Sequence, residues 1–563
     1  MTAAQNTWDL ARLTRAGATI LASLLLLVSS SALARSPVSV PGVNFNDWYE
    51  TRKRDRDGVF SEFSLINYFF VRGTAANALP DPAGLRGVSL GPFGAAGGSA
   101  TRVADGQNFL IEQRWIPVIS FSPFFTSGWA TFRAMVEVDF TWGIAANAAQ
   151  QNQGGGLNAD QINIQTKAVY AAIFPTKNEE KLSIQIGTQP VYDSVYNPHT
   201  TSLFDIVRTG YKLMYLGTDA TAATVYSRYF GVLAKAAFIP IGAAQPEKAT
   251  DDDPSFSFAW MLQLDLAYPV APDTVIGLSY WRLQDDTQGR AFAFEGLVNS
   301  GPTSGGLSGF TGTTKLGINQ ADGHVNYLGL NVHHNIKFNT SDWAFSGYFM
   351  FNFGKFTTEI DPKNTPNTEV KILGFAANLE ANYNWGMTQD DVLTLEALYA
   401  SGDDDPQDDT FSGPFTLNYY GLPGAVWFNH RCLILFPFTS TVNNYTGAVT
   451  DISNQGAGLI TVIATGSWDV IPHKLNVKLG AAFALAAADP VDYRDTNGDP
   501  IANRGRFIGA ELNAEVKYHL RYLMTLGLHG GVMFKSKNGF FAGNELVKGH
   551  PWAAFTTFTW YAF

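Results

Sequence analysis

The sequence has little charge. Asp, Glu, Lys and Arg make up 15% of its 563 residues, whereas an ordinary soluble domain has roughly 25%. The balance is acidic, with 38 basic against 49 acidic residues and a formal net charge of −11. Nucleic-acid binding depends on lysine and arginine at the phosphates, so this composition predicts a protein that binds no nucleic acid.

Cysteine is nearly absent. Cys432 is the only one, which excludes an internal disulfide framework and every metal or haem site that needs a cluster of cysteines. The sequence has no C-x-x-C-H motif, so it attaches no c-type haem of its own. We therefore expect neither a cofactor nor a bound metal.

Long hydrophobic runs are missing after the first 34 residues, because Gly, Asn, Asp or Lys interrupts each apolar stretch. The mean hydropathy of −0.03 also argues against a bundle of spanning helices. Aromatic residues nevertheless reach 13%, and there are 54 glycines. Low charge, many aromatics and middling hydropathy are typical of a β-barrel wall that is apolar outside and polar inside.

The first 34 residues read as an export signal. Arg12 and Arg15 precede the apolar run "ILASLLLLV", and the small residues Ala32 and Ala34 precede Arg35. A charged region, a short apolar region and an A-x-A site are the parts of a signal peptide. The alternative is an uncleaved anchor, but the run is shorter than the roughly 20 residues of a spanning helix. The sequence predicts a signal peptide over 1–34 and a single barrel domain over 35–563.

Strict alternation of apolar and polar residues dominates the remainder. It is clear in "WATFRAMVEVDFTWG" (129–143), "GFAANLEANYNWG" (374–386) and "FIGAELNAEVKYHL" (507–520). A period of two is the period of a β-strand. A soluble antiparallel sandwich would alternate in the same way, with its polar face outward, so alternation alone leaves both architectures open.

Connection lengths separate the two. Strands placed by this pattern are joined by links that are alternately short, as in "PTKNE", "GTDAT", "PVAPD", "GMTQD" and "PHK", and long, as in 73–106, 285–322, 402–456 and 488–503. Short periplasmic turns and long outer loops are typical of transmembrane barrels. We expect an all-β, antiparallel, up-and-down barrel of about 18 strands, give or take two. The expected strands are 59–72, 107–120, 128–143, 160–174, 180–189, 206–216, 222–239, 255–268, 273–284, 323–338, 341–357, 369–385, 391–401, 457–470, 474–487, 504–519, 521–534 and 551–563.

The last residues, "PWAAFTTFTWYAF", form a strand with no face suited to water. A barrel in lipid must close, because an unpaired edge would leave peptide groups unsatisfied in hydrocarbon. We therefore expect this strand to pair with the first one, "VFSEFSLINYFFVR". The terminal Phe563 resembles the C-terminal signal of bacterial outer-membrane barrels.

The last third of the chain resembles the alginate-export-like porins, a family of large outer-membrane barrels. The residues that carry the resemblance are "LTLEALYASGDDDPQDDTF" (Leu393 to Phe411), "GAELNAEVKYHLRYLMTLGLHGGVMF" and "TTFTWYAF". The resemblance implies an 18-stranded barrel and passive transport. The inward polar positions mix charge signs, whereas an anionic polysaccharide calls for a basic lumen, which argues against alginate as the cargo.

Polar residues on the face opposite the apolar one are candidates for lining the pore, where fixed charges and hydrogen-bonding groups select solutes. The alternative is that they pair with one another across the wall. The candidates are Arg133, Glu137, Asp139, Gln263, Asp265, Asn331, His333, Lys337, Asn378, Glu380, Asn382, Lys474, Lys478, Glu511, Asn513, Glu515 and Lys517.

The link from Gly402 to Gly456 contains the apolar run "HRCLILFPF", and such a run should not stand in water. We expect it to fold into the barrel mouth and narrow the pore. The alternative is a further pair of strands, giving a count of twenty. The candidate constriction residues are His430, Arg431, Cys432, Leu433, Ile434, Leu435 and Phe436.

Catalysis and metal binding have weaker support. The acidic runs "TDDDP", "GDDDPQDD" and "DTNGD" offer hard oxygen ligands for Ca²⁺, but solvated acidic loops have the same composition. His333, His334, His519 and His529 lie on expected strands without a local motif that couples them to a nucleophile. We expect no enzyme.

The sequence therefore predicts an outer-membrane porin, a water-filled channel for passive diffusion of small hydrophilic solutes or saccharides, surrounded by lipid and lipopolysaccharide. The alternatives are an exporter of a specific polysaccharide and a barrel sheath around a partner electron-transfer protein. Whether the barrel acts alone or as a trimer stays open.

Overall fold

The computed structural model describes residues 63–80, 101–123, 129–143, 161–176, 181–191, 216–244, 257–288, 316–418, 431–436, 447–449, 452–454, 456–492, 503–521, 523–544 and 547–562. The predicted signal peptide over 1–34 lies outside these ranges. No helix in the described part of the chain combines the length and the hydropathy that crossing a bilayer requires.

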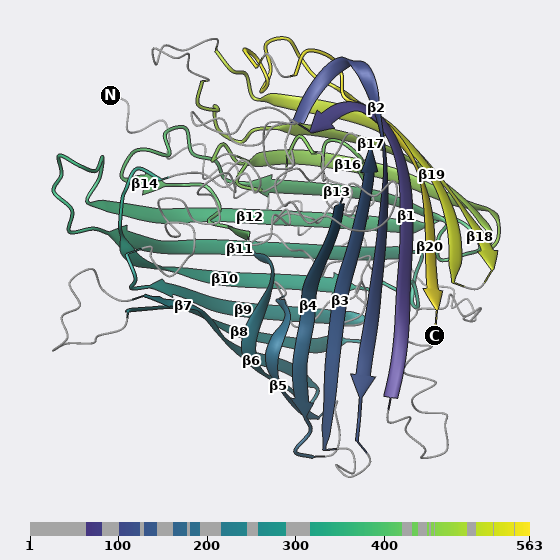
Figure 1. The fold of residues 1–563 in the computed structure, drawn as a ribbon, viewed down its shortest axis with the longest axis horizontal. Coiled ribbons are helices and arrows are strands. Elements are labelled where there is room, and N and C mark those ends of the chain that lie inside the picture. The colour runs from purple at the N-terminus through teal and green to yellow at the C-terminus, as the bar shows by residue number, and fades with distance from the viewer. Residues whose placement is uncertain are drawn as a thin grey trace.

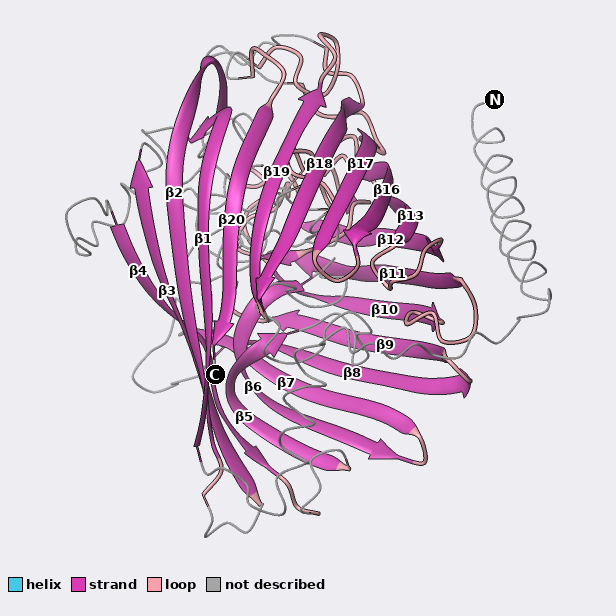
Figure 2. Cartoon of the chain, turned by 90° about the vertical axis from the view of Figure 1, so that its right-hand side faces the viewer, coloured by secondary structure: helices cyan, strands magenta, loops and turns pink. Residues whose placement is uncertain are grey.

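Eighteen long strands make one continuous antiparallel wall (Figures 1 and 2). Each pairs with its neighbours in chain order, and β20 returns to pair with β1. The wall strands are β1 (Phe63–Pro80), β2 (Thr101–Phe121), β3 (Ala130–Gly143), β4 (Gln161–Ile173), β5 (Leu182–Val191), β6 (Leu216–Tyr229), β7 (Val232–Ala244), β8 (Ser257–Ala271), β9 (Thr274–Asp285), β10 (Asp322–His334), β11 (Trp343–Thr357), β12 (Glu369–Asn384), β13 (Val392–Ala400), β16 (Leu459–Ile471), β17 (Leu475–Leu485), β18 (Phe507–Arg521), β19 (Met524–Phe534) and β20 (Trp552–Ala562). The closed 18-stranded barrel is confirmed.

Two more strands, β14 (Thr410–Phe411) and β15 (Leu417–Asn418), are too short to belong to the wall. They lie in the long link between β13 and β16 and pair in parallel with β12 and β6. Because β13 pairs directly with β16, the alternative of two further wall strands in this link is wrong.

The alternation of short and long links is confirmed, with two corrections. The long link expected over 73–106 is shorter, because β1 continues to Pro80 and β2 begins at Thr101. The second correction lies between β5 and β8. We expected "GTDAT" to be a turn between strands 206–216 and 222–239, but those residues lie inside β6, and Thr218 to Thr221 pair with β5. The turn falls at Phe230 and Gly231, whose φ angles are 55° and 77°. Positive φ at both central residues is what a two-residue hairpin of type I′ requires. Residues 206–215 lie outside the described ranges.

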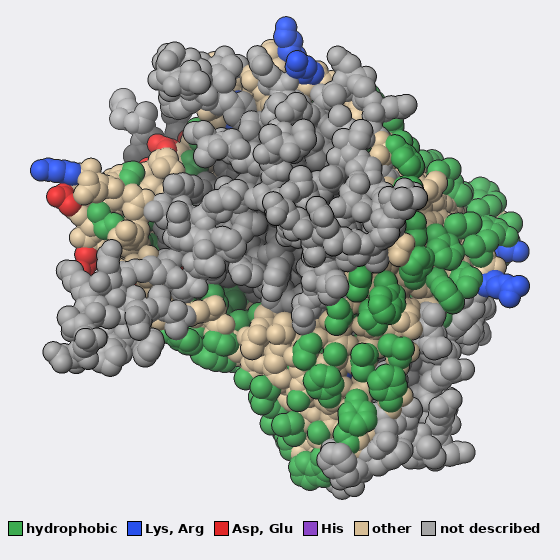
Figure 3. All heavy atoms as spheres, in the orientation of Figure 1, with side chains coloured by type: hydrophobic (Ala, Val, Ile, Leu, Met, Phe, Trp, Pro, Cys, Tyr) green, Lys and Arg blue, Asp and Glu red, His purple; other side chains and the backbone are tan. Residues whose placement is uncertain are grey.

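The outer face of the wall is apolar. On β11 the outward side chains run from Trp343 through Phe345, Phe349 and Phe351 to Phe353, and Lys355 follows. Ten residue steps span ~33 Å along a strand, which becomes ~25 Å when the strand tilts as barrel strands do. Figure 3 shows hydrophobic side chains over the outside of the strands, with the charged side chains in view at the margins. The band matches the hydrocarbon thickness that outer-membrane barrels present.

The seam between β1 and β20 closes the barrel. Its register runs from Asn67 opposite Ala562 to Ala76 opposite Ala553. Above this ladder the Asn77 side chain donates a hydrogen bond to the His550 carbonyl at 2.9 Å and accepts one from the Trp552 amide at 2.8 Å. The expected pairing of the last strand with the first is confirmed, although Phe563 itself lies outside the described ranges.

Candidate functional site

Most of the candidate pore-lining residues share the inner face of the wall. They occupy the positions that alternate with the exposed apolar side chains, and most of them are buried. Those on this face are Arg133 on β3, Gln263 and Asp265 on β8, Asn331 and His333 on β10, Asn378, Glu380 and Asn382 on β12, Lys478 on β17, and Glu511, Asn513, Glu515 and Lys517 on β18. Glu137 and Asp139 lie on β3, but their side chains are outside the described set.

Two candidates are corrected. Lys337 was expected on a strand over 323–338, but β10 ends at His334, and Lys337 is exposed in the turn before β11. Lys474 is exposed in the turn before β17, where its ammonium lies 5.6 Å from the centre of the Tyr518 ring. Neither lysine belongs to the inner wall, because each strand is shorter at its turn than the sequence pattern indicated.

Many inward charges pair with one another across the strands. Lys235 and Asp265 form an ion pair at 2.7 Å, and both side chains are nearly inaccessible to solvent. Arg72 pairs with Glu112 at 2.5 Å. Neither Arg72, Glu112 nor Lys235 was among the sequence candidates, although all three have the inward phase of their strands. The period-two alternation of the sequence identifies these positions as inward, but it does not predict which inward polar groups contact one another.

Glu515 collects basic groups from three neighbouring strands. Its carboxylate lies 3.1 Å from the Lys478 ammonium and 2.6 Å from the Lys517 ammonium. The His529 ring contacts the same carboxylate at 2.8 Å and the Thr557 hydroxyl at 3.0 Å. Lys517 is the most accessible of these groups, with 35% of its side chain exposed. The cluster therefore presents net positive charge to the interior.

Carboxylate, imidazole and hydroxyl in series are also parts of nucleophilic catalysis. Here two lysine ammonium groups share the carboxylate of Glu515, and Thr557 is only 8% exposed. Three other strand histidines meet hydroxyl groups too: His333 meets Ser346, His334 meets Thr274, and His519 meets Thr525. Hydroxyl partners are thus common among the described histidines of this wall, and they give no specific support to an enzyme.

The expected constriction residues Arg431 to Phe436 contact the inner wall, while His430 lies outside the described ranges. The Arg431 guanidinium meets the Glu380 carboxylate through both terminal nitrogens, at 3.0 and 3.2 Å, and also bonds Glu396. Asn382 donates to Glu380 and Asn378 donates to Glu396, each at 2.7 Å. A bidentate arginine pair combines charge with fixed geometry, so this network holds one end of the segment against β12 and β13.

Glu511 on β18 holds the other end. Its carboxylate accepts hydrogen bonds from the backbone amides of Leu433, Ile434 and Leu435 at 2.7, 3.0 and 2.6 Å. Successive amides that converge on one anion form a nest, and charge-assisted bonds of this kind are stronger than neutral ones. Asn513 bridges the two attachments, because it donates both to Glu511 at 2.8 Å and to the Arg431 carbonyl at 2.9 Å.

Packing completes the attachment. A Cβ atom at Gly531 on β19 would lie 3.2 Å from Leu433 Cδ1, so the missing side chain makes room for this leucine. Cys432 is fully buried. Burial, together with the negative Glu511 and Glu396, raises the pKa of its thiol well above the ordinary value. The segment that we name the inner segment, residues 431–436, thus follows the wall from β12 to β19.

The acidic runs give no metal site in the part of the chain that the structure describes. No group of three or more His, Cys, Asp or Glu side chains there is arranged to hold an ion. In "GDDDPQDD" the Asp403 carboxylate accepts backbone hydrogen bonds from Asp405 at 2.9 Å and Ser412 at 2.6 Å. It therefore acts as a loop cap. The runs "TDDDP" and "DTNGD" lie outside the described ranges.

Comparison with known proteins finds only low similarity to solved structures. No family model matches the sequence, and no curated protein matches it. Among solved structures, Pseudomonas aeruginosa OpdQ has a TM-score of 0.44 and 9% identity over 89% of this chain and 99% of its own. The outer membrane protein OprD from the same organism has a TM-score of 0.43 and 12% identity over 88% and 93%. OccK2 (OpdF), solved in complex with glucuronate, has a TM-score of 0.43 and 10% identity over 89% and 98%. This chain is thus similar at low level to outer-membrane barrels, and the values are too low to transfer a solute.

Proposed function

We propose that this chain forms a channel in the cell outer membrane through which small hydrophilic solutes diffuse passively. The observation that supports this proposal is the closed wall of 18 antiparallel strands, apolar on its outer face and polar on its inner face. Such a wall satisfies every strand's backbone within lipid. The short turns then face the periplasm and the long loops face outward.

Reconstitution in a planar bilayer tests this function directly. The purified mature chain should give stepwise ionic currents, and candidate sugars and organic acids should be screened for their ability to block them. The control is the same preparation after heat unfolding, which should be silent. If folded, membrane-inserted protein carries no current, the channel function is refuted.

We further propose that the inner segment narrows this channel. Its support is the double attachment to the inner face, by Arg431 at Glu380 and Glu396 and by the backbone amides at Glu511. Because the Glu511 carboxylate binds backbone amides, it fixes the path of the inner segment independently of the side chains of that segment. Size exclusion together with the fixed inner charges then gives the channel its selectivity.

Deletion of residues 425–445 tests the narrowing. The shortened chain should form larger single-channel steps than the intact chain, since the segment no longer occupies part of the lumen. An unchanged conductance in a folded deletion variant would mean that the segment does not limit flow. The matching control removes Lys337, which is exposed in the turn before β11.

A further inference from the structure

Basic side chains gather on the outer face of the wall at the long-loop end of β9 to β12. His324 lies directly opposite Lys355 in the β10–β11 ladder, and Lys355 lies directly opposite Lys371 in the β11–β12 ladder. All three have the outward phase of their strands. Arg282 on β9 has the same phase and lies one step nearer the apolar band, opposite Asn326.

These charges are only partly compensated. Like charges directly opposite each other destabilise a sheet. Lys355 has one partner, Glu369, at 3.2 Å, and both side chains are about half exposed. Lys371 makes no ion pair within the described residues. Arg282 bonds the neutral Gln284 at 2.7 Å. The row therefore gains stability from an anion supplied by its surroundings.

The position of these basic side chains relative to the apolar band indicates which kind of anion they bind. Toward the long-loop end, Lys355 is the next outward residue after Phe353 on β11, and Lys371 is the next outward residue beyond Leu373 on β12. Both lysines therefore lie at the border of the apolar band. The acidic Glu369 lies one outward position farther from the band than Lys371, and Asp286 lies just beyond the end of β9. Cations next to hydrocarbon and acids beyond them match the layer where lipid phosphates lie. On β16 and β17 the outward side chains nearest the same end, Ile460 and Leu485, are apolar, so the basic row does not continue on these two strands.

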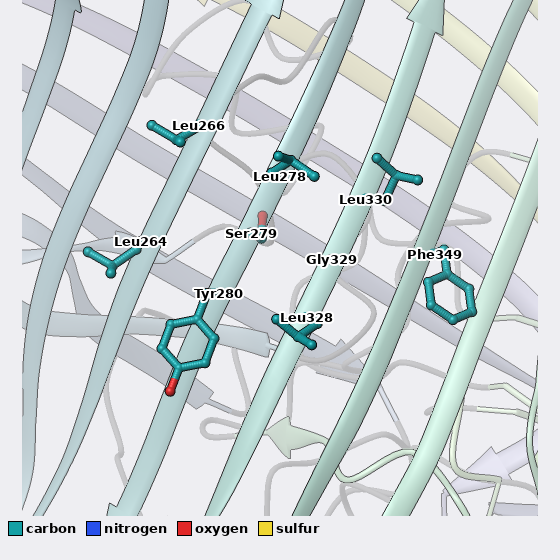
Figure 4. A pocket seen from close by; sticks show the side chains of 9 residues that line it. All are labelled: Leu264, Leu266, Leu278, Ser279, Tyr280, Leu328, Gly329, Leu330 and Phe349. Carbon is teal, nitrogen blue, oxygen red and sulfur yellow. The ribbon is translucent and has the colours of Figure 1, made fainter.

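An apolar hollow lies below the row on the same strands. It has a volume of about 470 Å³, and Leu264, Leu278, Leu328, Leu330 and Phe349 line it (Figure 4). Gly329 lies between Leu328 and Leu330 and contributes only backbone to the floor of the hollow, because a side chain at this position would point inward, toward Met350 and Ser279. Above the hollow, the Tyr280 hydroxyl donates to Asn326 at 3.0 Å, which is a typical position for tyrosine at a membrane interface.

We propose that this face binds a phosphorylated glycolipid of the outer leaflet, of the lipopolysaccharide type. Its phosphates meet Arg282, Lys355 and Lys371, and one acyl chain descends over the leucine-lined hollow. The inference rests on the proposed function only in placing the long-loop end at the outer surface. It needs no current through the barrel.

Native mass spectrometry of the detergent-solubilised barrel tests the site with bisphosphorylated lipid A as the probe. The double variant Lys355→Gln/Lys371→Gln should bind it roughly 30-fold more weakly, because each lysine near an anionic lipid surface contributes a factor of about five. The matched control, Lys337→Gln/Lys474→Gln, makes the same change of charge at the opposite end and should bind as the wild type does. Single-channel conductance in phosphatidylcholine should be the same for all three, which separates this inference from the channel function.

Two further arms identify the ligand chemistry. With dephosphorylated lipid A of the same chains, the difference between wild type and the double variant should disappear. Inorganic phosphate alone should not displace the lipid, and if it did so completely the site would belong to free phosphate. Equal binding of bisphosphorylated lipid A by the wild type and the double variant, or an equal loss in the control, would overturn the proposal. If the double variant fails to fold, Arg282→Gln provides the same test.

Discussion

At the scale of single residues, glycines decide where the inner segment can lie. Gly531 faces inward and its missing side chain leaves space for Leu433, whereas the neighbouring Gly530 faces outward, and a Cβ atom there would meet nothing nearer than 4.0 Å. The two positions form a natural pair for testing whether the segment is held by shape as well as by charge.

Valine at position 531 should release the segment. Overpacking costs about 1–3 kcal/mol, and ~1.4 kcal/mol corresponds to a factor of ten. The buried thiol of Cys432 should then react with a water-soluble maleimide about 5- to 150-fold faster than in the wild type. The Gly530→Val variant is the control and should label as slowly as the wild type. Equal labelling rates in the two variants would show that the position of Leu433 does not depend on the space beside Gly531.

The inward cations differ in how far solvent reaches them. Lys517 is 35% exposed, whereas the Lys235 side chain is 4% exposed. The Lys517→Glu substitution should therefore shift the reversal potential of the channel in a salt gradient toward cation selectivity. The turn substitution Lys337→Glu makes the same change of charge outside the lumen and should leave the potential where it is. A shift of equal size in both variants would point to the general charge of the protein.

At the scale of elements, the turn between β12 and β13 is organised by one carboxylate. Asp391 is buried and accepts hydrogen bonds from the amides of Met387 and Thr388 at 2.7 and 2.9 Å. It also accepts one from the amide of Asp469 on β16 at 2.8 Å. Burial alone would raise the pKa of this carboxyl, but the backbone hydrogen bonds from Thr388, Asp469 and Met387 outweigh burial and lower it.

This lowered pKa has a defined consequence for stability. A carboxyl whose pKa is lower in the folded state stabilises the fold above its unfolded pKa of about 3.9, and this contribution is lost as pH falls through the folded value. The Asp391→Asn variant should unfold more easily than the wild type at pH 7, and the difference should vanish in strong acid. The exposed Asp404→Asn is the control, and chemical denaturation in detergent across this range is the measurement. If the difference in stability between the wild type and Asp391→Asn persists unchanged at low pH, the effect comes from altered packing or geometry and not from the charge of Asp391.

The seam between β1 and β20 depends on Asn77 at its upper end. An alanine there leaves the His550 carbonyl and the Trp552 amide without their side-chain partner. A lost hydrogen bond in a part-buried place costs about 1–3 kcal/mol. We expect the Asn77→Ala barrel to unfold at a lower denaturant concentration, with its first loss of structure at this seam by hydrogen exchange. Protection that falls first elsewhere would show that another pair of strands is weaker.

At the scale of the whole molecule, the outer face is suited to lipid and the inner face is suited to water. The outer face is a continuous apolar band with basic side chains at one border, and the inner face holds paired charges and a buried segment of the 402–456 link. In the part of the chain that the structure describes, the buried ion pairs lie on the inner face, so the wall meets lipid with an apolar surface. This arrangement explains a composition that fits neither a soluble domain nor a helical membrane protein.

The sequence by itself predicted most of the strands, their approximate number and the closure of the barrel. The physical reason is that side-chain alternation and link length are local properties, which can be read without knowing any partner. Where a local signal was weak, as at Phe230 and Gly231, the expected turn was misplaced. Lys337 and Lys474 were likewise assigned to strands that end before them.

Only the tertiary structure decided which inward groups meet and where the inner segment goes. Arg431 reaches Glu380, 51 residues away, and the Leu433 amide reaches Glu511, 78 residues away. No periodicity encodes such pairs, because they depend on how the curved wall brings β12, β13, β18 and β19 around one segment. Closure of the sheet sets that curvature, and closure is a property of all 18 strands together.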